Sequence, residues 1–341
     1  LFTSRGYTGG LDHSANDVRQ QTTGAHVQYL TETTQSDTVV AYQQKAFGAV
    51  DFYGVTNGRL AAEELRDTLV MTSWRHDHGK HDGFIRLAAS WREIQDVYTL
   101  DERDPYYYEN THTTRTGTAA IDGRLAGDAP LALTWRLALE DERIDSDGLF
   151  KNAPTKGLGQ HERQRYIGMV LPEWSTEAFR LRLGTQIVDF SGEKLEPLLI
   201  SDITAHLTES HTLLLACTQT VRQPSFTELE YESPTSLGSR GLGNERNTEC
   251  AITLTSRWSD FFRTECTIFR RETRHAVDWI QTAAGGRWQA TDMGDVDTEG
   301  CHLLGSWTTS DDASVEVSYQ YLAKRTLTAL HASRYLFHYP D

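Results

Sequence analysis

The stretch Leu131-Ala132-Leu133-Thr134-Trp135-Arg136-Leu137-Ala138-Leu139 determines the predicted fold class. Its odd positions are all large and apolar, whereas its even positions hold alanine, threonine and arginine. Successive side chains of a β-strand point to opposite faces, so this alternation is typical of a strand with one apolar face. A helix would instead repeat its apolar residues three and four positions apart. The stretch therefore predicts a β-strand.

The same period of two recurs along the chain. In residues 315–321 valine and tyrosine alternate with Glu316, serine and glutamine, and in residues 179–183 apolar residues alternate with Arg180 and Arg182. Similar runs lie at residues 85–91, 121–125, 167–171 and 250–254. The sequence lacks convincing amphipathic helices. We predict an all-β fold.

Short and long connections alternate between these runs. Polar short turns are predicted at residues 34–37, 78–82, 127–129, 173–176, 209–210, 259–260 and 310–313. They recur about every 36–53 residues. Between them lie long connections, including residues 46–63, 93–110, 143–160 and 221–244. About seven such units predict about 14–16 strands.

Two kinds of architecture have repeats of this size. A WD-type β-propeller blade is similar in length but needs four strands, whereas each unit here shows two. An antiparallel up-and-down transmembrane β-barrel has two strands per unit, with short turns at one rim and long loops at the other. We favour the barrel over the propeller and over a soluble sandwich, whose apolar face would be buried in a shared core.

The polar positions and the aromatic residues fit a membrane barrel. Arg86, Arg136, Arg180, Arg182 and Glu316 are expected to line a wet interior while the apolar face meets lipid. Aromatic residues near the predicted turns are expected at the bilayer interface; they are Trp74, Trp91, Trp174, Trp258, Phe261 and Phe262.

Composition excludes several other classes of protein. The 341 residues contain 33 Lys plus Arg and 48 Asp plus Glu, a formal net charge of −15, which argues against nucleic acid as a partner. No stretch approaches the roughly 20 apolar residues of a membrane-spanning helix. The four cysteines (Cys217, Cys250, Cys266 and Cys301) are widely spaced and indicate neither a zinc site nor a disulfide framework.

Several motifs carry a family resemblance. They are Ser4-Arg5-Gly6-Tyr7-Thr8 with Leu11-Asp12, Tyr42-Gln43-Gln44-Lys45-Ala46-Phe47-Gly48-Ala49 with Phe52-Tyr53, Arg75-His76-Asp77, Asp104-Pro105-Tyr106-Tyr107-Tyr108-Glu109-Asn110-Thr111-His112-Thr113-Thr114, Arg222-Gln223-Pro224-Ser225-Phe226-Thr227-Glu228-Leu229, Gly243-Asn244-Glu245-Arg246 with Glu249, Val277-Asp278-Trp279-Ile280, and Gly294 with Thr298-Glu299-Gly300. In this order they resemble motifs of TonB-dependent outer-membrane receptors, particularly the cobalamin-receptor-like branch. The leucine and proline of that family's G-N-x-x-L-x-P-E segment are missing here, and Cys301 and His302 follow Gly300 where glutamate is usual.

The resemblance implies an incomplete domain. Family members have an N-terminal plug domain and a barrel of about 22 strands. We therefore expect residues 1–341 to be a receptor β-barrel domain truncated at both ends, without the plug, and its first and last strands not to pair.

Two groups of residues have the composition of metal sites. His76, Asp77 and His78, with His81 and Asp82, hold the densest set of potential ligands, but a solvated polar turn explains them better. Asp145 and Asp147 lie in a predicted long loop and could offer oxygens to calcium, but the distal glutamate of an EF-hand is missing. We therefore predict no metal site and no cofactor.

Other candidate residues indicate binding rather than catalysis. Tyr106, Tyr107 and Tyr108 are expected either to form a ligand platform or to pack the loop. Arg222 and Glu228 are expected to pair with each other or with the plug. The sequence lacks G-x-S-x-G, P-loop and H-E-x-x-H motifs, so we predict no enzyme and no catalytic residues; the ligand-binding residues stay unknown.

The resemblance implies active transport at the Gram-negative outer membrane. The expected partners are the TonB complex (through the plug), outer-membrane lipid, and a scarce small-molecule or metal-chelate ligand such as cobalamin or an iron–siderophore. A passive outer-membrane channel and a secreted β-propeller binding module are the alternatives.

Overall fold

A computed structural model describes most of the chain. It describes residues 1–9, 16–50, 58–78, 82–127, 130–151, 153–191, 195–233, 236–281, 286–310, 313–326 and 332–334. Leu11-Asp12, Phe52-Tyr53 and His81 therefore lie outside the described residues. The chain forms two compact units, unit 1 (residues 1–123, 136–167 and 189–193) and unit 2 (residues 124–135, 168–188 and 194–341).

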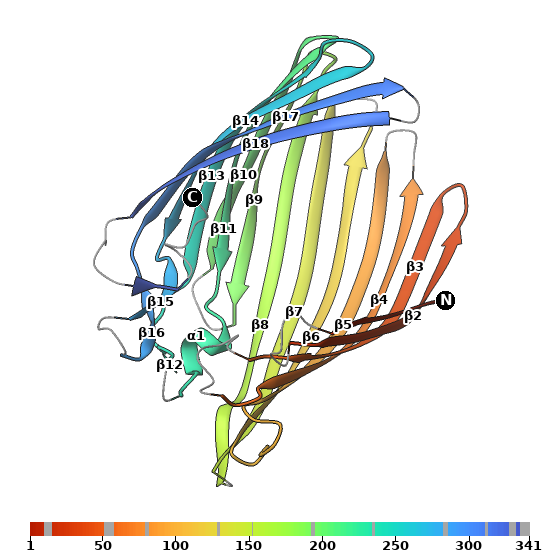
Figure 1. The fold of residues 1–341 in the computed structure, drawn as a ribbon. Helices are drawn as coiled ribbons and strands as arrows, with labels where there is room; N and C mark the ends of the chain where they lie inside the picture. The colour runs from red at the N-terminus through yellow and green to blue at the C-terminus, as the bar shows by residue number, and fades with distance from the viewer. Residues whose placement is uncertain are drawn as a thin grey trace. The chain divides into compact units, whose positions relative to one another are not determined.

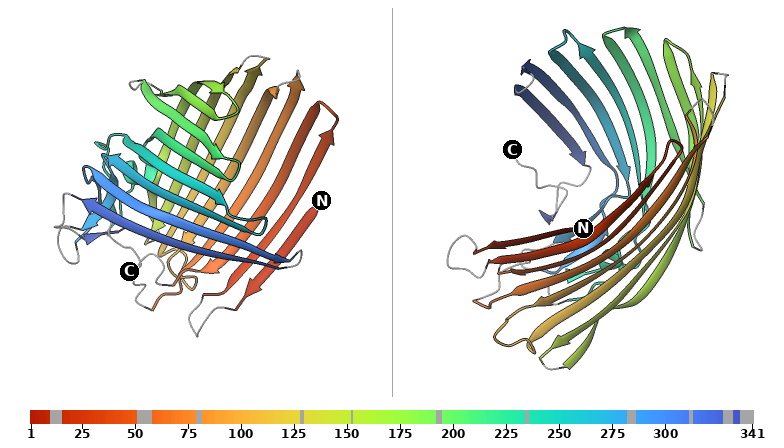
Figure 2. Two further views of the ribbon diagram at one scale, coloured as in Figure 1. Left: turned by 90° about the horizontal axis from the view of Figure 1, so that it is seen from above. Right: turned by 90° about the vertical axis from the view of Figure 1, so that its right-hand side faces the viewer.

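The fold is all-β, as predicted (Figure 1). One sheet has fifteen strands, within the predicted range, and each strand pairs with the next strand of that sheet; β12, β15 and β16 of the smaller sheet intervene in the chain after β11 and β14. Its order begins at β1 and ends at β18. Figure 2 shows the succession β1 to β5 in unit 1 from two further directions. The strands are β1 (Phe2–Thr8), β2 (Val18–Leu30), β3 (Thr34–Gly48), β4 (Ala62–His78), β5 (Gly83–Thr99), β6 (Tyr108–Ala126), β7 (Leu131–Phe150), β8 (Ala153–Ser175), β9 (Phe179–Phe190), β10 (Glu196–Thr208), β11 (His211–Arg222), β13 (Glu245–Arg257), β14 (Phe262–Arg274), β17 (Val296–Ser310) and β18 (Ala313–Thr326).

A second, smaller sheet is built from the connections. It contains β12 (Ser236–Leu237), β16 (Trp288–Asp292), β15 (Val277–Gln281) and β19 (Ala332–Ser333), in that order. A five-residue helix, α1 (Phe226–Glu230), precedes β12. In the described part of the chain no helix has the length and apolar character needed to cross a membrane.

The predicted turns are largely confirmed, but one predicted long loop is wrong. Short connections join β4 to β5, β10 to β11 and β13 to β14 where expected, and the turn predicted at residues 34–37 lies at residues 31–33. The predicted loop 143–160 is mostly strand, because β7 continues to Phe150 and β8 begins at Ala153. The predicted loop 93–110 shrinks to residues 100–107, whereas 221–244 remains a long connection that holds α1 and β12.

The alternating apolar residues form continuous rows across unit 2. Register places Leu181, Ile203, Leu215, Ile252 and Ile268 side by side on β9, β10, β11, β13 and β14. Ile252 is 50% exposed and Ile268 is 60% exposed. Among the residues that the structure describes, no second layer of sheet or helix buries these rows, unlike the apolar face of a sandwich. This face, called the apolar face, is therefore free to contact hydrocarbon.

The apolar face of unit 1 has a clear border. Val40, Val70 and Trp91 lie side by side on β3, β4 and β5. Four residues further toward the long connections, the same face carries Gln44 and Arg66. At about 3.3 Å per residue, the face changes from apolar to polar within about 13 Å along the strand. Such a border is typical of the edge of a lipid-facing band.

The opposite face, called the polar face, carries cross-strand ion pairs. In unit 1 Arg86 donates to Asp122 at 3.0 Å, and Arg136 lies 3.8 Å from the same carboxylate. In unit 2 Arg182 donates to Asp202 at 2.8 Å. The placement of these arginines on the face opposite the apolar residues agrees with the prediction from the alternation.

Several of the predicted aromatic residues lie at the short-turn ends of the strands, but Trp91 lies in the middle of β5 beside Val70, so its predicted place at a turn is wrong. Trp258 and Phe261 flank the turn between β13 and β14 and are both exposed. Trp174 packs edge-on against Phe179 across the β8–β9 turn, with ring centroids 4.9 Å apart. Their position suits a bilayer interface, which stays a prediction.

The structure contains a disulfide that the sequence did not indicate. Cys217 on β11 and Cys250 on β13 are directly opposite each other and are bonded, while Cys266 and Cys301 are free. The two bonded residues are separated by 33 positions, so only the strand register reveals the pair. The bond closes a loop that includes α1 and β12.

We predict that a charge on the apolar face destabilises the protein according to its depth. Ile252→Arg in the full-length protein is expected to cost about 2–4 kcal/mol of unfolding free energy in lipid vesicles, because the guanidinium would enter hydrocarbon. Thr248→Arg, on the same face and strand but beyond the apolar rows, should cost about 0–1 kcal/mol. Equilibrium unfolding in vesicles measures both. Equal costs for the two variants would show that this face does not meet lipid.

Candidate functional site

The long-connection end of unit 2 is organised around Arg222. This residue ends β11, and register places it opposite Glu245, the first residue of β13. Its Nη1 and Nη2 donate to the two carboxylate oxygens of Glu228 at 2.8 and 3.1 Å, and its Nε donates to Glu245. The bidentate geometry fixes α1 relative to the two strands. The predicted pairing of Arg222 with Glu228 is therefore present, and Glu245 is a third member that sequence analysis missed.

Helix α1 is held by a reciprocal cap. The Ser225 hydroxyl accepts from the Glu228 backbone N at 3.2 Å, and the Glu228 carboxylate accepts from the Ser225 backbone N at 2.7 Å. This capping box satisfies backbone donors that a short helix leaves open. Burial raises the pKa of Glu228, but hydrogen bonds from Arg222 and Ser225 outweigh that effect and leave the pKa below its ordinary value.

Glu245 also joins this cluster to the small sheet. Its second carboxylate oxygen accepts from the Val277 backbone N at 2.5 Å, at the start of β15. The adjacent Asp278 is buried and accepts from the Trp279 backbone N at 2.6 Å and from the Ser333 hydroxyl. One buried carboxylate thus fixes β15 to β13, and another fixes β15 to β19. We call α1, β12, β15, β16 and β19 the cap.

The long-connection end of unit 1 carries an aromatic cluster. Tyr107 and Tyr108 each pack edge-on against Phe150, with centroids 6.0 and 6.3 Å apart, and Tyr108 also contacts Tyr98. The guanidinium of Arg59 lies over the Tyr107 ring at 4.5 Å. Two of the three predicted tyrosines are therefore loop-packing residues. The third, Tyr106, is 64% exposed and is available for contact.

An ion pair fixes the loop that presents these tyrosines. Arg103 donates from Nε and Nη2 to the Asp101 carboxylate, both at 2.8 Å, and from Nη2 to the Gly58 carbonyl at 3.0 Å. The hydrogen bonds from Arg103 lower the pKa of Asp101 to about 2. Residues 100–107 are thereby tied to the chain that leads into β4.

The histidine-rich turn makes no metal site within the described ranges. His76 Nδ1 lies 3.0 Å from the Thr34 hydroxyl, and its ring stacks on Trp74 at 5.9 Å. Arg75 donates to Asp77 at 2.7 Å. His81, which was part of the predicted cluster, lies outside those ranges. Among the described residues no group of three or more His, Cys, Asp and Glu could hold a metal ion.

The calcium candidate lies in a strand and not in a loop. Asp145 and Asp147 belong to β7, so the loop prediction for them is wrong. The buried Ser146 hydroxyl lies 2.7 Å from His112 Nδ1 and accepts from the Leu158 backbone N at 2.8 Å. Those bonds join β7 to β6 and to β8. Residues 145–148 (Asp-Ser-Asp-Gly), although typical of turns, are therefore part of strand β7 and bond it to its neighbours.

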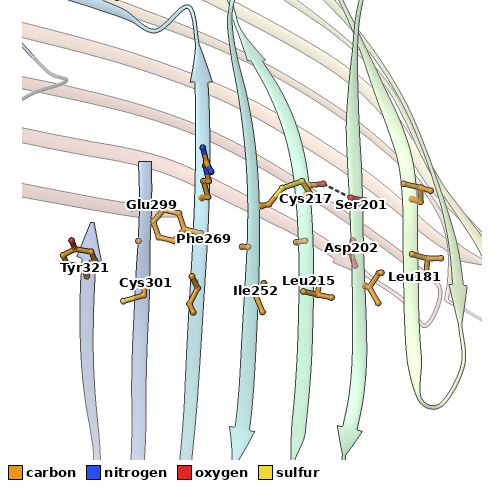
Figure 3. Close-up of a pocket in the computed structure, with 18 residues that line it drawn as sticks. Leu181, Ser201, Asp202, Leu215, Cys217, Ile252, Phe269, Glu299, Cys301 and Tyr321 are labelled. Atoms are coloured by element: carbon orange, nitrogen blue, oxygen red, sulfur yellow. Dashed lines mark hydrogen bonds between the residues drawn. A yellow bond between two sulfur atoms is a disulfide. The ribbon is translucent and has the colours of Figure 1, made fainter. Parts of the chain in front are cut away.

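An apolar hollow lies over the middle of unit 2. Figure 3 shows that Leu181, Leu215, Ile252 and Tyr321, which line it, come from different strands. Register also places Ala216, Ala251 and Gly300 in one row with Phe269, and the Phe269 ring lies against Gly300. Small residues in that row leave the backbone uncovered. The lining is mostly apolar, so the hollow offers contact area rather than polar chemistry.

We predict that removing Arg222 loosens the cap. In the Arg222→Ala variant the buried Glu245 and the half-buried Glu228 carboxylates lose their cation, so the free energy of opening α1 should fall by about 1.5–3 kcal/mol. Hydrogen exchange of the Ser225 and Glu228 amides measures this, with Ile252 in β13 as the internal reference. Arg240→Ala is the matched control, because Arg240 is 81% exposed and pairs with Glu230, and its loss should cost about 0–1 kcal/mol. Equal effects of both variants would contradict the role given to Arg222.

We also predict that the cap loosens in acid. The folded-state pKa of Glu228 lies below its ordinary value of 4.5, so its stabilising effect is complete above pH 4.5. That effect is lost as pH falls through the lowered value, because the protonated carboxyl no longer pairs with Arg222. Hydrogen exchange of α1 after incubation at successive pH values measures the loss. The Glu228→Gln variant keeps an acceptor for the capping hydrogen bond but has no titrating carboxyl, so its exchange should show no transition from this group.

Comparisons with known proteins show what the fold resembles. No family model and no curated protein matches the sequence. Solved structures do match, among them the siderophore receptor PirA from Pseudomonas aeruginosa, with 12% identity and a TM-score of 0.70 over 91% of this chain and 57% of that chain. The copper transporter OprC has 12% identity and a TM-score of 0.71 over 92% of this chain and 54% of that chain.

The alcaligin outer membrane receptor FauA from Bordetella pertussis is also similar. It has 14% identity and a TM-score of 0.63 over 91% of this chain and 54% of its own. The chain thus spans little more than half the length of these three proteins. The chain has the fold of part of the antiparallel β-barrel found in these receptors and this transporter.

Proposed function

We propose that this chain is part of an outer-membrane receptor for energy-coupled uptake of a scarce solute such as cobalamin or an iron–siderophore chelate. The observation that carries the proposal is the exposed apolar face, whose rows cross several strands without a covering layer. A sheet with such a face and this fold belongs in lipid. We accordingly place the protein in the Gram-negative outer membrane.

The polar face suits the interior of such a barrel. Its arginine–carboxylate pairs, such as Arg86 with Asp122 and Arg182 with Asp202, supply charged and hydrogen-bonding groups that an enclosed domain could contact. In the proposed mechanism an N-terminal plug closes the barrel, and the TonB complex pulls on the plug to open a path. The pairs also hold neighbouring strands together across a wet surface.

Ligand capture is assigned to the long-connection end. In unit 2 the long connections form the cap, and in unit 1 they form the aromatic cluster; each is ordered structure beyond the apolar rows of its own unit. The exposed Tyr106 ring offers a surface for a large, partly apolar solute. The names of the three similar structures refer to a siderophore, to copper and to alcaligin. By analogy, the cargo proposed for this chain is a metal chelate.

We predict that uptake depends on energy coupling. The full-length protein, expressed in cells that lack their own receptors, should support uptake of its chelate when TonB is present and lose nearly all of it when TonB is deleted. Deletion of the plug from the full-length protein should abolish the TonB-dependent component. Growth on limiting chelate and radiolabel accumulation measure both.

The same assay separates the rival functions. A passive channel would give uptake that is equal with and without TonB. A secreted propeller-type module would be recovered without detergent after membrane fractionation, and either result would overturn the proposal.

A further inference from the structure

Two carboxyl groups meet on the polar face of unit 1, next to the aromatic cluster. Register places Glu63 of β4 opposite Tyr98 of β5, and Asp96 lies two positions from Tyr98 on the same face. Glu63 is 6% exposed, and its side chain is hydrogen-bonded to that of Asp96. The Oδ1 atom of Asp96 is buried and has no hydrogen-bond partner among the described residues. We call Glu63 and Asp96 the carboxyl pair.

The contact within the carboxyl pair requires a proton. Ionised carboxylates have only acceptor oxygens, so two of them cannot hydrogen-bond to each other, and one must keep a hydrogen and donate it. Asp96 lies beyond the lipid-facing band, because its neighbour Gln95 is opposite Arg66 on the polar side of the border. Burial of Asp96, the charge of Glu63 and the hydrogen bond to it raise the pKa of Asp96 to about 7. Asp96 is therefore the donor and Glu63 the acceptor.

The charged groups on the nearest strands have other partners. Arg92, on the same face of β5, donates to the two oxygens of Asp67 at 3.0 and 2.6 Å. Lys45 of β3 has its ammonium 4.9 Å from the centre of the Phe47 ring. Register places Phe47 opposite Glu63, so this positive charge lies on the Glu63 side of the carboxyl pair.

Strand β6 brings an imidazole to the other side of the pair. The Leu100 backbone N donates to the Tyr108 carbonyl at 3.0 Å, and this alignment of β5 with β6 places His112 level with Asp96. Burial lowers the pKa of His112, so its ring is uncharged at neutral pH. Its Nδ1 lies 2.7 Å from the Ser146 hydroxyl. The imidazole therefore does not replace the proton of the carboxyl pair by a positive charge.

We propose that Asp96 holds the proton that its contact with Glu63 requires, and that loss of this proton as the pH rises loosens the aromatic cluster. Two ionised carboxylates in contact repel each other, which pushes β4 and β5 apart beside Tyr98. The Tyr98 ring packs edge-on against Tyr108 of the cluster, with centroids 6.2 Å apart. The consequence for ligand capture rests on the proposed function, whereas the proton and the loosening do not.

Proton linkage gives the direction of the effect. When the cluster opens, Asp96 reaches water and its pKa returns toward the ordinary value of 3.8. From about pH 5 to about pH 7 the closed form therefore binds more protons than the open form, so its stability falls as the pH rises. The equilibrium constant for opening should increase about tenfold per pH unit over this range and level off above about pH 7, where both forms are ionised.

Hydrogen exchange of the Leu100 amide in the full-length protein tests the coupling, after division by the intrinsic exchange rate at each pH. The wild-type protein should show the tenfold increase per pH unit. Asp96→Asn keeps a donor for Glu63 but has no titrating proton, so its opening constant should not change with pH. Asp67→Asn is the matched control, because it removes a carboxylate that pairs with Arg92, and it should keep the wild-type slope.

Infrared difference spectra between the wild-type protein and Asp96→Asn test the proton directly. The C=O band of the protonated carboxyl should disappear with a midpoint near pH 7. In Glu63→Gln, compared with the double variant, the midpoint should move to lower pH, because the neighbouring charge is gone. The proposal is overturned if Asp96 is already ionised at pH 5, or if the band titrates while wild-type exchange shows no slope.

These measurements do not depend on transport. If uptake needs no TonB but the Asp96 band and the exchange slope behave as expected, the proposed transport mechanism fails and this inference stands. If uptake needs TonB but the slope is absent, this inference alone is rejected.

Discussion

The pairing of backbone groups between neighbouring strands is the constraint on which the rest of the structure depends. In hydrocarbon an unpaired N–H or C=O costs several kcal/mol, so a lipid-facing sheet must keep its ladders continuous. The register from β10 through β11, β13, β14 and β17 to β18 does so over most of each strand. Once those ladders are fixed, side chains can point only to one face or to the other.

The sequence predicted which residues form the apolar face and which form the polar face, because the alternation can be read along each strand without knowing how the strands pair. Leu215 and Ile252 belong to runs that are apolar at alternate positions. A pairing shifted by one residue would turn one strand's apolar residues to the other face, so the alternation itself favours registers that keep both sets on one side. The strand ends were harder to predict. Asp145, Ser146 and Asp147 have turn chemistry, yet Ser146 bonds to His112 and to the Leu158 backbone and so continues the sheet. Local propensity was outweighed there by partners distant in sequence.

Partnerships across the sheet were beyond sequence reasoning for the same reason. The Cys217–Cys250 bond and the role of Glu245 both need the register of β11 with β13, which no local pattern encodes. The pairing of Arg222 with Glu228 was predictable, because the two lie six residues apart in a recognisable motif. The aromatic cluster shows an intermediate case. The three tyrosines stood out in the sequence, but only the long β7 strand brings Phe150 to Tyr107 and Tyr108.

Two arginines illustrate how one residue type serves two ends of such a sheet. Arg222 lies at the long-connection end, where three of its nitrogens meet the carboxylates of Glu228 and Glu245, and the result is a rigid support for the cap. Arg180 lies near the short-turn end, where the adjacent Thr204 hydroxyl is its one hydrogen-bond acceptor among the described residues. An arginine whose donors are saturated by its own chain organises structure, because nothing further needs to bind. Arg180 keeps a buried donor for which the described residues supply no acceptor, so its own chain anchors it less completely than Arg222 is anchored.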